Sequence, residues 1–289
     1  MLKKSMLILL LGLFLVVLAA CGTSSEETGG DGGEQPADTE ETEDTGSDAE
    51  ATEDDSAADT EDDKVYTVAT DNGYVPFEYL DEDSGELVGF DIDLIKALAD
   101  EVGIEIDIQA MEFSGVVAGI GSGRFDIGIA GMTITEERKE NIDFSQPYYD
   151  AGLILAVRSD NDEIKSVDDL SGKTVATRSG STSETYIKEK TEGTPEAFPQ
   201  ITEAYQNVIA GRADAVIYDV PNVQYYANKE AGGELKTVGE RLTGEQYGIA
   251  FPKGSELRDK FDDALTTLKD NGTFGDIYEE WFGERPEGM

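Results

Sequence analysis

The sequence predicts an α/β protein with two lobes, each built on a largely parallel sheet. From residue 64 onward, strand-like and helix-like segments alternate, which is typical of α/β architecture. In addition, "GRFDIGI" (123–129) and "GRADAVI" (211–217) share Gly-Arg-x-Asp before an apolar strand, as expected if one helix–turn–strand unit occurs twice. Open α/β sheets bind ligands beyond the carboxyl ends of their strands. We therefore expect a single ligand cleft between the two lobes.

Periodicity and end signals predict the individual elements in chain order. Helical spacing is found in "GFDIDLIKALADEVG", where Asp91 is the expected N-cap, in "FSGVVAGIGSG", and in "LRDKFDDALTTLKDNG", which should end at Asn271-Gly272. β-branched or alternating runs predict strands at 65–69, 104–108, 125–130, 152–157, 173–177, 213–218 and 247–251. The strand ends at "AGMT" and at Tyr218-Asp219 should both point into the cleft.

The first 21 residues have the features of an export signal. Lys3 and Lys4 precede an apolar core over residues 6–18, which is shorter than the roughly 20 residues of a membrane span. The string "LAAC" resembles the lipobox of bacterial lipoproteins, which would make Cys21 the lipidated mature N-terminus. The alternative is an ordinary signal peptide with a chance cysteine. Since Cys21 is the only cysteine, no intramolecular disulfide is possible.

Residues 22–63 are predicted to be a disordered acidic tether. They contain 18 acidic residues and no basic or aromatic one, so they cannot bury enough apolar surface to offset their ordering entropy. Residues 64–289 retain a net charge of −25, which argues against nucleic-acid binding. So acidic a surface suggests the hypothesis that the protein works in a saline habitat. A midpoint of thermal unfolding that did not rise between low and molar salt would contradict this hypothesis.

Several kinds of chemistry are disfavoured by residue content and spacing. The chain has no histidine, which removes Ser-His-Asp and Cys-His catalysis and histidine-ligated zinc. "SGKT" (171–174) has Val167 where a phosphate loop needs glycine, and "DEDSGE" (81–86) has Gly85 in place of an acidic calcium ligand, so a hairpin turn is expected there. "GIGSG" (119–123) precedes its strand, unlike a dinucleotide motif. We expect neither a metal nor a cofactor.

Two charged residues at predicted element ends are candidate ligand contacts. Arg138 follows Glu136 and Glu137 at the start of a helix, where its rigid fork and the free N–H groups suit a carboxylate. The plainer interpretation is a surface arginine paired with a nearby glutamate. Asp219 stands where the second lobe's strand ends, and its plainer interpretation is an N-cap before Pro221.

Three further positions have both a structural and a functional interpretation. "SGSTSE" (179–184) predicts a capping box from Ser181 to Glu184, and its free N–H groups are also suited to an anion. Tyr74 and Phe113 are aromatic residues in predicted loops, and each is either core or a platform for a ligand. All of these positions lie at strand ends or helix starts, where this fold places its cleft.

These residues stand within blocks that resemble a known family. "ATDNGYVPFEY", "GELVGFDIDL", "AGMTITEERKENIDFSQPYY", "RADAVIYDVPN" and "NGTFGDIYEEWFG" are similar to the solute-binding proteins of ABC-type polar amino-acid importers, above all to their glutamine-binding members. The resemblance covers residues 64–286. It implies a two-lobe periplasmic-binding-protein fold of type II with two hinge strands, near 148–152 and 244–247. One lobe would comprise 64–149 and 247–289, and the other 150–246.

The resemblance also implies a ligand site drawn from both lobes. Arg138 and the Thr133 backbone would hold the α-carboxylate, with help from the helix start at Ser181 and Thr182. Asp219, the Gly131 carbonyl and the Thr133 hydroxyl would take the α-ammonium. The site residues are Asp71, Tyr74, Phe113, Ala130, Gly131, Thr133, Arg138, Arg178, Ser181, Thr182, Tyr218 and Asp219.

The side-chain end of this site carries the question of specificity. Tyr74 and Phe113 would enclose the ligand side chain, and Asp71 would accept from its amide. Arg178 and Tyr218 stand where glutamine-binding members have lysine and histidine, and Thr182 stands where they have glycine. We expect glutamine, with glutamate favoured by Arg178 or a basic ligand favoured by Asp71 as alternatives.

The resulting expectation is a monomeric receptor, lipid-anchored on the outer face of the cell membrane, that passes an L-amino acid to a permease and its ATPase. A dehydratase-like enzyme on the same scaffold is the rival from another class, and it would need a general acid facing the ligand. A third interpretation is a sensory or adhesive lipoprotein that has lost transport.

Overall fold

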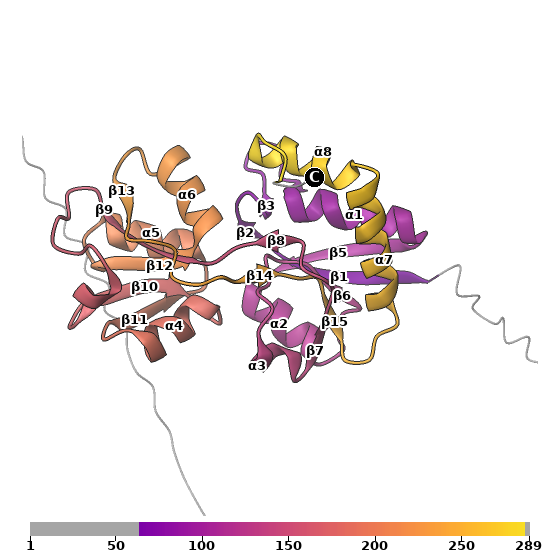
Figure 1. The fold of residues 1–289 in the computed structure, drawn as a ribbon, viewed down its shortest axis with the longest axis horizontal. Helices are drawn as coiled ribbons and strands as arrows, with labels where there is room; N and C mark the ends of the chain where they lie inside the picture. The colour runs from indigo at the N-terminus through magenta and orange to yellow at the C-terminus, as the bar shows by residue number, and fades with distance from the viewer. Residues whose placement is uncertain (1–63, 287–289) are drawn as a thin grey trace, which may run out of the picture. The chain divides into compact units, whose positions relative to one another are not determined.

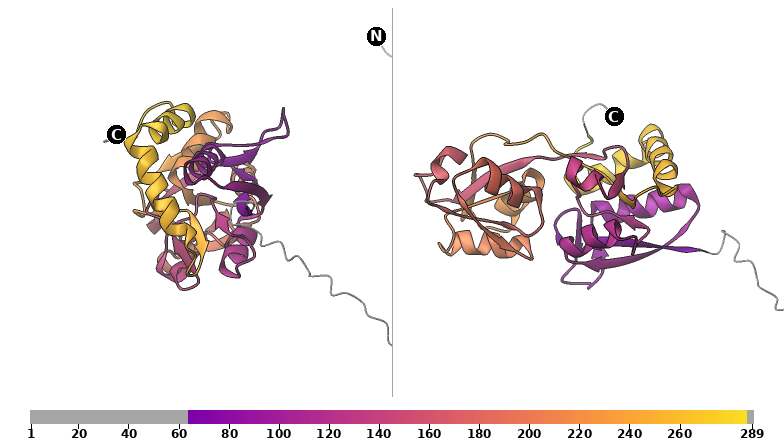
Figure 2. Two further views of the ribbon diagram at one scale, coloured as in Figure 1. Left: turned by 90° about the vertical axis from the view of Figure 1, so that its right-hand side faces the viewer. Right: turned by 90° about the horizontal axis from the view of Figure 1, so that it is seen from below.

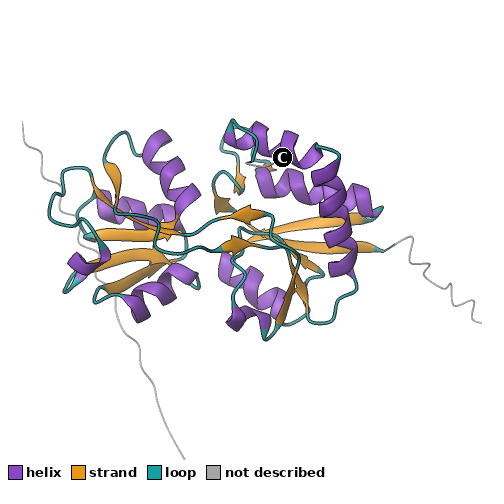
Figure 3. Cartoon of the chain, in the orientation of Figure 1, coloured by secondary structure: helices purple, strands orange, loops and turns teal. Residues whose placement is uncertain are grey.

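The computed structural model describes residues 64–286, which form two five-stranded sheets with flanking helices and two smaller sheets (Figures 1 and 3). The predicted signal peptide at 1–21, the lipidation site Cys21 and the acidic tether at 22–63 lie outside the described residues. We call the part built on the sheet that contains Val65–Asp71 the first lobe. The part built on the sheet that contains Leu153–Arg158 is the second lobe.

The sheet of the first lobe has the strand order β5-β1-β6-β15-β7. The strand at Val65–Asp71 pairs in parallel with one neighbour from Val65↔Glu105 to Asp71↔Met111 and with the other at two positions. The strand at Ala250–Pro252 pairs antiparallel with the strands on both sides of it, so it alone runs against the other four. The strands are β1 (Val65–Asp71), β5 (Glu105–Met111), β6 (Ile127–Gly128), β7 (Ile142–Phe144) and β15 (Ala250–Pro252).

Helices cover both faces of this first sheet. On one face α1 (Phe90–Val102), α7 (Leu257–Asp270) and α8 (Thr273–Phe282) pack together, as Figure 1 shows. They bury the apolar stripes predicted from helical spacing in one core cluster. On the other face, α2 (Phe113–Gly121) contributes to a separate cluster, and the short α3 (Glu136–Lys139) packs near β7.

The second lobe has the strand order β11-β10-β12-β9-β13. Pairing is parallel among the first three strands and antiparallel on both sides of β9. Its strands are β9 (Leu153–Arg158), β10 (Thr174–Arg178), β11 (Thr194–Phe198), β12 (Ala215–Asp219) and β13 (Leu235–Val238). Each sheet is therefore mixed, where the sequence predicted largely parallel pairing.

The helices of the second lobe again lie on both faces of the sheet (Figures 1 and 2). One face carries α5 (Ile201–Ile209) and α6 (Val220–Lys229), and the other carries α4 (Thr182–Lys190) and the 3₁₀ turn η2 (Val167–Leu170). The starts of α4 and α6 follow directly from the carboxyl ends of β10 and β12. That placement brings their first residues to the edge facing the first lobe.

Two short strands carry the chain between the lobes. β8 (Tyr149–Asp150) and β14 (Gln246–Tyr247) pair antiparallel with each other, at the two segments predicted as hinges. A small antiparallel sheet of β2 (Gly73–Tyr74), β3 (Glu78–Leu80) and β4 (Leu87–Val88) contains the hairpin turn predicted at 81–86. The two-lobe fold expected from the resemblance is confirmed.

One local prediction is wrong. Asp91 is not the N-cap of α1, because the helix starts earlier, with Gly89 at the cap position. A Cβ on Gly89 would lie 2.1 Å from the Phe77 carbonyl oxygen, so the backbone can come this close only at glycine. The Asp91 side chain instead points inward, where its Oδ2 accepts from Gly131 N at 2.8 Å and from the Tyr148 hydroxyl at 2.8 Å.

Within residues 64–286, no helix is long and apolar enough to span a membrane. The same residues contain no cluster of three or more acidic, histidine or cysteine side chains placed to hold a metal ion.

Candidate functional site

Arg138 is the cation of the candidate site and lies at the start of α3. Thr135 caps this helix by accepting from Arg138 N at 3.1 Å. The guanidinium donates from Nη1 to Thr133 O at 2.8 Å and from Nη2 to Gly180 O, in the second lobe, at 3.2 Å. Among residues 64–286 it forms no ion pair, so the plainer interpretation, a surface pair with a neighbouring glutamate, does not hold.

Gly131 shapes the loop that precedes Arg138. Its φ is +51°, and a Cβ on it would lie 2.3 Å from Cε1 of Tyr74. Only glycine fits a backbone that passes so close to a buried ring. Ala130, directly before it, is buried, and Thr133 forms an isolated bridge to Tyr247. The loop is therefore held between the Tyr74 ring and the second linker, at Tyr247.

The start of α4 presents hydroxyls from the second lobe. Ser181 is its N-cap, accepting from Glu184 N at 3.2 Å, as the capping prediction requires. The Glu184 carboxylate, however, accepts from Gly180 N at 2.8 Å and not from the N-cap backbone. The Thr182 hydroxyl donates to Glu245 Oε2 at 2.9 Å, and the Thr133 hydroxyl donates to the same oxygen at 3.3 Å.

Asp219 is the anion of the candidate site. It occupies the N-cap position of α6 but makes no capping hydrogen bond. Its Oδ2 accepts instead from the Tyr74 hydroxyl at 3.1 Å and, closely, from the Tyr247 hydroxyl. Its Oδ1 is buried and has no hydrogen-bond partner among the described residues. Burial raises the pKa of Asp219 to about 7, because the charged form loses its water.

The side-chain end of the site contains a buried ion pair between the lobes. Arg178 Nη1 contacts Asp71 Oδ2, and both side chains are at most 1% exposed. Arg178 Nε donates to Pro199 O at 3.2 Å, and Asp71 Oδ1 accepts from Asn72 N at 2.7 Å. Arg178 Nη2 is buried without a hydrogen-bond partner in the described part of the chain. One donor at this end therefore stays available to a ligand.

The predicted aromatic pair is arranged differently from a simple sandwich. Tyr74 stacks on Phe77, with ring centroids 5.0 Å apart, and meets Tyr218 edge-on at 5.9 Å. Phe113 lies against two guanidiniums, those of Arg138 at 5.2 Å and of Arg178 at 5.3 Å. Its ring thus contacts both cations and stabilises them by cation–π interaction.

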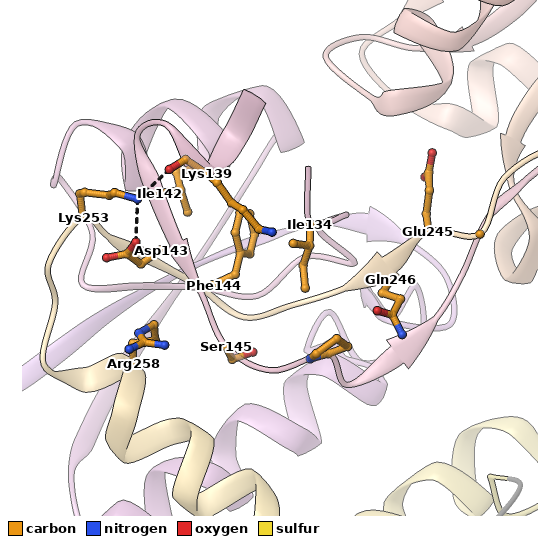
Figure 4. Close-up of a pocket in the computed structure, with 12 residues that line it drawn as sticks. Ile134, Lys139, Ile142, Asp143, Phe144, Ser145, Glu245, Gln246, Lys253 and Arg258 are labelled. Carbon is orange, nitrogen blue, oxygen red and sulfur yellow. Dashed lines mark hydrogen bonds and ion pairs between the residues drawn. The ribbon is translucent and has the colours of Figure 1, made fainter. Parts of the chain in front are cut away.

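Among the cavities near these residues, one is lined by three of the twelve predicted contacts. It has a volume of about 440 Å³ and is lined by Arg138, Ser181, Thr182 and Glu245 among others. A more spacious pocket of about 650 Å³ lies beside the second linker, and none of the predicted site residues line it (Figure 4). We assign the site to the former, because donors from both lobes converge there.

Two residues of the site were missed by sequence reasoning. Tyr247 was assigned only to a hinge strand, yet its hydroxyl contacts both Asp219 and the Tyr74 hydroxyl. Glu245 was one acidic residue among many, and its contact with Thr133 and Thr182 gave no sequence signal. A polar aromatic at the end of a hinge strand was the one available hint for Tyr247.

The arrangement is suited to a zwitterion. Arg138 and Asp219 come from different lobes, and neither is paired with an opposite charge in the described residues. Asp219 is buried and Arg138 is half-buried. Charges removed from water without partners are costly, so a ligand that supplies a carboxylate to one and an ammonium to the other would stabilise both. Contacts from both lobes to one molecule would also hold the lobes together.

Comparison with known proteins gives concordant matches. A family model, bacterial extracellular solute-binding proteins, family 3, matches residues 66–284. The chain is 36% identical over 231 residues to the arginine-binding extracellular protein ArtP of Bacillus subtilis, covering 77% of this chain and 88% of ArtP. It is 35% identical over 295 residues to the ABC transporter glutamine-binding protein GlnH of the same organism, covering 98% and 99%.

The solved structures that match include an ancestral arginine-binding protein. Bound to arginine it has a TM-score of 0.72 and 44% identity, and the match covers 76% of this chain and 98% of that one. The same description with glutamine bound has a TM-score of 0.72 and 45% identity, with the same coverage.

Proposed function

The chain belongs to the bacterial extracellular solute-binding proteins of family 3, and we propose that it captures an L-α-amino acid for an ABC importer. The observation that carries this proposal is the pair of unmatched charges, Arg138 and Asp219, from opposite lobes. Arg138 receives the α-carboxylate and Asp219 the α-ammonium. Ligand binding then favours the closed arrangement, because only that arrangement contacts the ligand from both lobes.

We propose glutamine as the substrate, on the basis of the side-chain end of the site. Asp71 and Arg178 neutralise each other there, while Arg178 Nη2 remains free to donate. A neutral amide supplies both an acceptor for Arg178 and donors for Asp71. Glutamate would satisfy Arg178 but would add an anion beside Asp71.

Arginine is the second candidate, because relatives of similar identity are named for it. Its guanidinium would have to replace Arg178 at Asp71, leaving two guanidiniums close together beside Phe113. Two like charges that lie close together in a buried site repel each other strongly, which would weaken the binding of arginine. This argument favours glutamine over arginine.

A thermal-shift panel of the twenty amino acids tests the choice. The full-length Cys21→Ala chain, which lacks the proposed lipid attachment site, is melted with each amino acid and the best ligands are titrated by calorimetry. A ligand at 1,000 times its Kd stabilises the fold by about 4 kcal/mol. We expect glutamine to give the largest rise, followed by glutamate. Arginine as the strongest ligand would overturn the substrate assignment, and no response to any amino acid would overturn the function.

We further propose that the protein is a monomeric lipoprotein held on the outer face of the membrane through Cys21, with residues 22–63 as a tether. Labelling cells with a radioactive fatty acid and comparing wild type with Cys21→Ser tests the anchor. Loss of the label and release of the protein into the medium are expected. Membrane retention of an unlabelled variant would contradict it.

The rival dehydratase activity is tested with the same preparation. Asp71 and Asp219, two carboxylates of the site, are assigned to recognition, and the matched relatives are named as binding proteins. Incubation with prephenate or arogenate should therefore leave the substrate unchanged. Turnover would reverse the assignment of a pure receptor.

A further inference from the structure

Glu245 places a third carboxylate in the site. It precedes β14 on the second linker, where its carbonyl oxygen accepts from Ala151 N at 2.8 Å and so ties one linker to the other. Figure 4 draws it among the residues that line the pocket of about 650 Å³, with its side chain directed toward the ribbon of the second lobe. Its Oε2 accepts from Thr182 and Thr133, one hydroxyl from each lobe.

The position of this carboxylate is close to that required of a bound ligand. The Thr133 carbonyl also accepts a hydrogen bond from Arg138. The second carbonyl that accepts from Arg138 is that of Gly180, two residues before Thr182. Glu245 lines the same cavity of about 440 Å³ as Arg138 and Thr182. An α-carboxylate held by Arg138, Thr133 and the start of α4, as proposed above, would need the space beside these two hydroxyls, where Glu245 Oε2 lies.

We propose that Glu245 is a tethered competitor for the α-carboxylate subsite: in the ligand-free protein it bridges Thr133 and Thr182, and an incoming amino acid must displace it. The proposal rests on the assignment of this subsite under the proposed function. It makes Glu245 an affinity-determining residue of the site. It also gives the ligand-free protein a bridge between the lobes that the ligand replaces.

The charges around the site agree with this role. Glu245 contributes to raising the pKa of Asp219, after burial, since two neighbouring carboxylates repel each other. Displacement of Glu245 by a ligand carboxylate exchanges one anion for another beside Arg138. The net charge of that subsite is then unchanged, while Asp219 gains an ammonium partner.

Substitution of Glu245 gives a result opposite to that for an ordinary contact residue. If Glu245 occupies the subsite nine-tenths of the time, the apparent Kd is raised about tenfold over its intrinsic value. Glu245→Ala should therefore bind the amino acid about tenfold more tightly, and Glu245→Gln should lie between it and wild type. Titration calorimetry on the full-length Cys21→Ala chain measures both.

Glu240→Gln is the matched control for charge removal. Glu240 is an exposed acidic residue five positions before Glu245, and it lines neither of the cavities described above. Its substitution should leave Kd within about twofold. An unchanged Kd in Glu245→Ala, or a gain no larger than the control's, would overturn the proposal. A weaker Kd would also overturn it and would make Glu245 a contact for a cationic ligand group.

A second measurement needs no ligand. Spin labels are placed on exposed helices of the two lobes, through Lys96→Cys in α1 and Lys190→Cys in α4, in the Cys21→Ala chain. Without ligand, Glu245→Ala should shift the distance distribution to longer values than in the parent, because the bridge is lost. Identical distributions would refute the bridge. If no amino acid binds any variant, the proposed function fails, while this distance measurement still decides whether Glu245 bridges the lobes.

Discussion

The two ends of the site treat their charges in opposite ways. At the side-chain end, Arg178 and Asp71 come from different lobes and contact each other directly in full burial. At the α-amino-acid end, Arg138 and Asp219 also come from different lobes, but they contact carbonyls and phenol hydroxyls. At the side-chain end the two opposite charges neutralise each other. At the other end a cation and an anion remain to be paired by a ligand.

This difference separates recognition of the groups that all α-amino acids share from selection among their side chains. Every α-amino acid brings the same carboxylate and ammonium, so under the proposed function the end with Arg138 and Asp219 would recognise the class. The end with Arg178 and Asp71 would meet the side chain that varies, and would discriminate through Arg178 Nη2, which has no hydrogen-bond partner among residues 64–286. Specificity built on unpaired buried polar groups is strong, because a wrong ligand leaves them unsatisfied.

Breaking the self-neutralised pair should have the largest effect, and it should fall on stability. Arg178→Gln leaves the Asp71 carboxylate buried without a cation, which costs about 3–5 kcal/mol of unfolding free energy. The double variant with Asp71→Asn should recover most of that loss. Urea unfolding of the ligand-free chain measures both.

The matched control is a surface pair. Arg158 and Asp160 form an ion pair with side chains 43% and 69% exposed. Arg158→Gln should change stability by less than about 1 kcal/mol. Equal losses for Arg178→Gln and Arg158→Gln would show that the buried contact does not hold the lobes together.

Breaking the other end should impair binding and leave the fold nearly intact. Arg138→Gln removes the cation proposed to receive the α-carboxylate, and loss of one partner of such a pair weakens binding by about 2–5 kcal/mol, or at least about thirtyfold in Kd. Calorimetry measures Kd, and circular dichroism monitors the fold. Lys139→Gln, next to it and paired with Glu136, is the control and should bind as wild type does. Unchanged affinity in Arg138→Gln would refute the contact.

The smallest expected effect is a pH dependence that only the α-amino-acid end should cause. With the pKa of Asp219 raised to about 7 by burial, the free site takes up a proton below that pH, and the ligand ammonium must expel it. Affinity should therefore fall as pH falls below about 7, by up to about tenfold per unit. Calorimetry in buffers of different ionisation enthalpy should detect the released proton.

Stability should change in the opposite direction. A carboxyl whose pKa is raised in the folded state favours folding when protonated, so the ligand-free protein should become more stable as pH falls from about 7 toward 4. Asp91, with its pKa raised to about 6 by burial, contributes with the same sign. Asp219→Asn should flatten the affinity profile and part of the stability profile. An affinity profile that stays sloped in Asp219→Asn would place the titrating group elsewhere.

Much of the fold was predictable because its signals are local. Helical spacing located α1, α2 and α7, and β-branched or apolar runs located the main strands of both sheets. The antiparallel pairing of β9 with β12 in one sheet, and of β15 with β6 in the other, was not predictable. Strand direction there depends on where the chain crosses between the lobes. Charge and position identified Arg138 and Asp219 as candidates by the same local logic.

Partners distant in sequence explain what local reasoning missed. Whether Asp219 caps α6 or faces the cleft depends on hydroxyls from Tyr74 and Tyr247, the first of which lies 145 positions away. Asp91 was expected at a helix cap because the close approach of Gly89 to Phe77 leaves no mark in the helical pattern. Glu245 became distinct only when the fold placed two threonines beside it.

The single tryptophan of the chain contacts residues outside the candidate site. Trp281, in α8, donates from its indole to Asp93 Oδ2 at 2.8 Å and meets Tyr79 edge-on. Its emission, excited at wavelengths where tyrosine does not absorb, therefore reports on the packing of α8 against α1 alone. Melting of the first lobe can thus be followed through one native side chain, without any added dye.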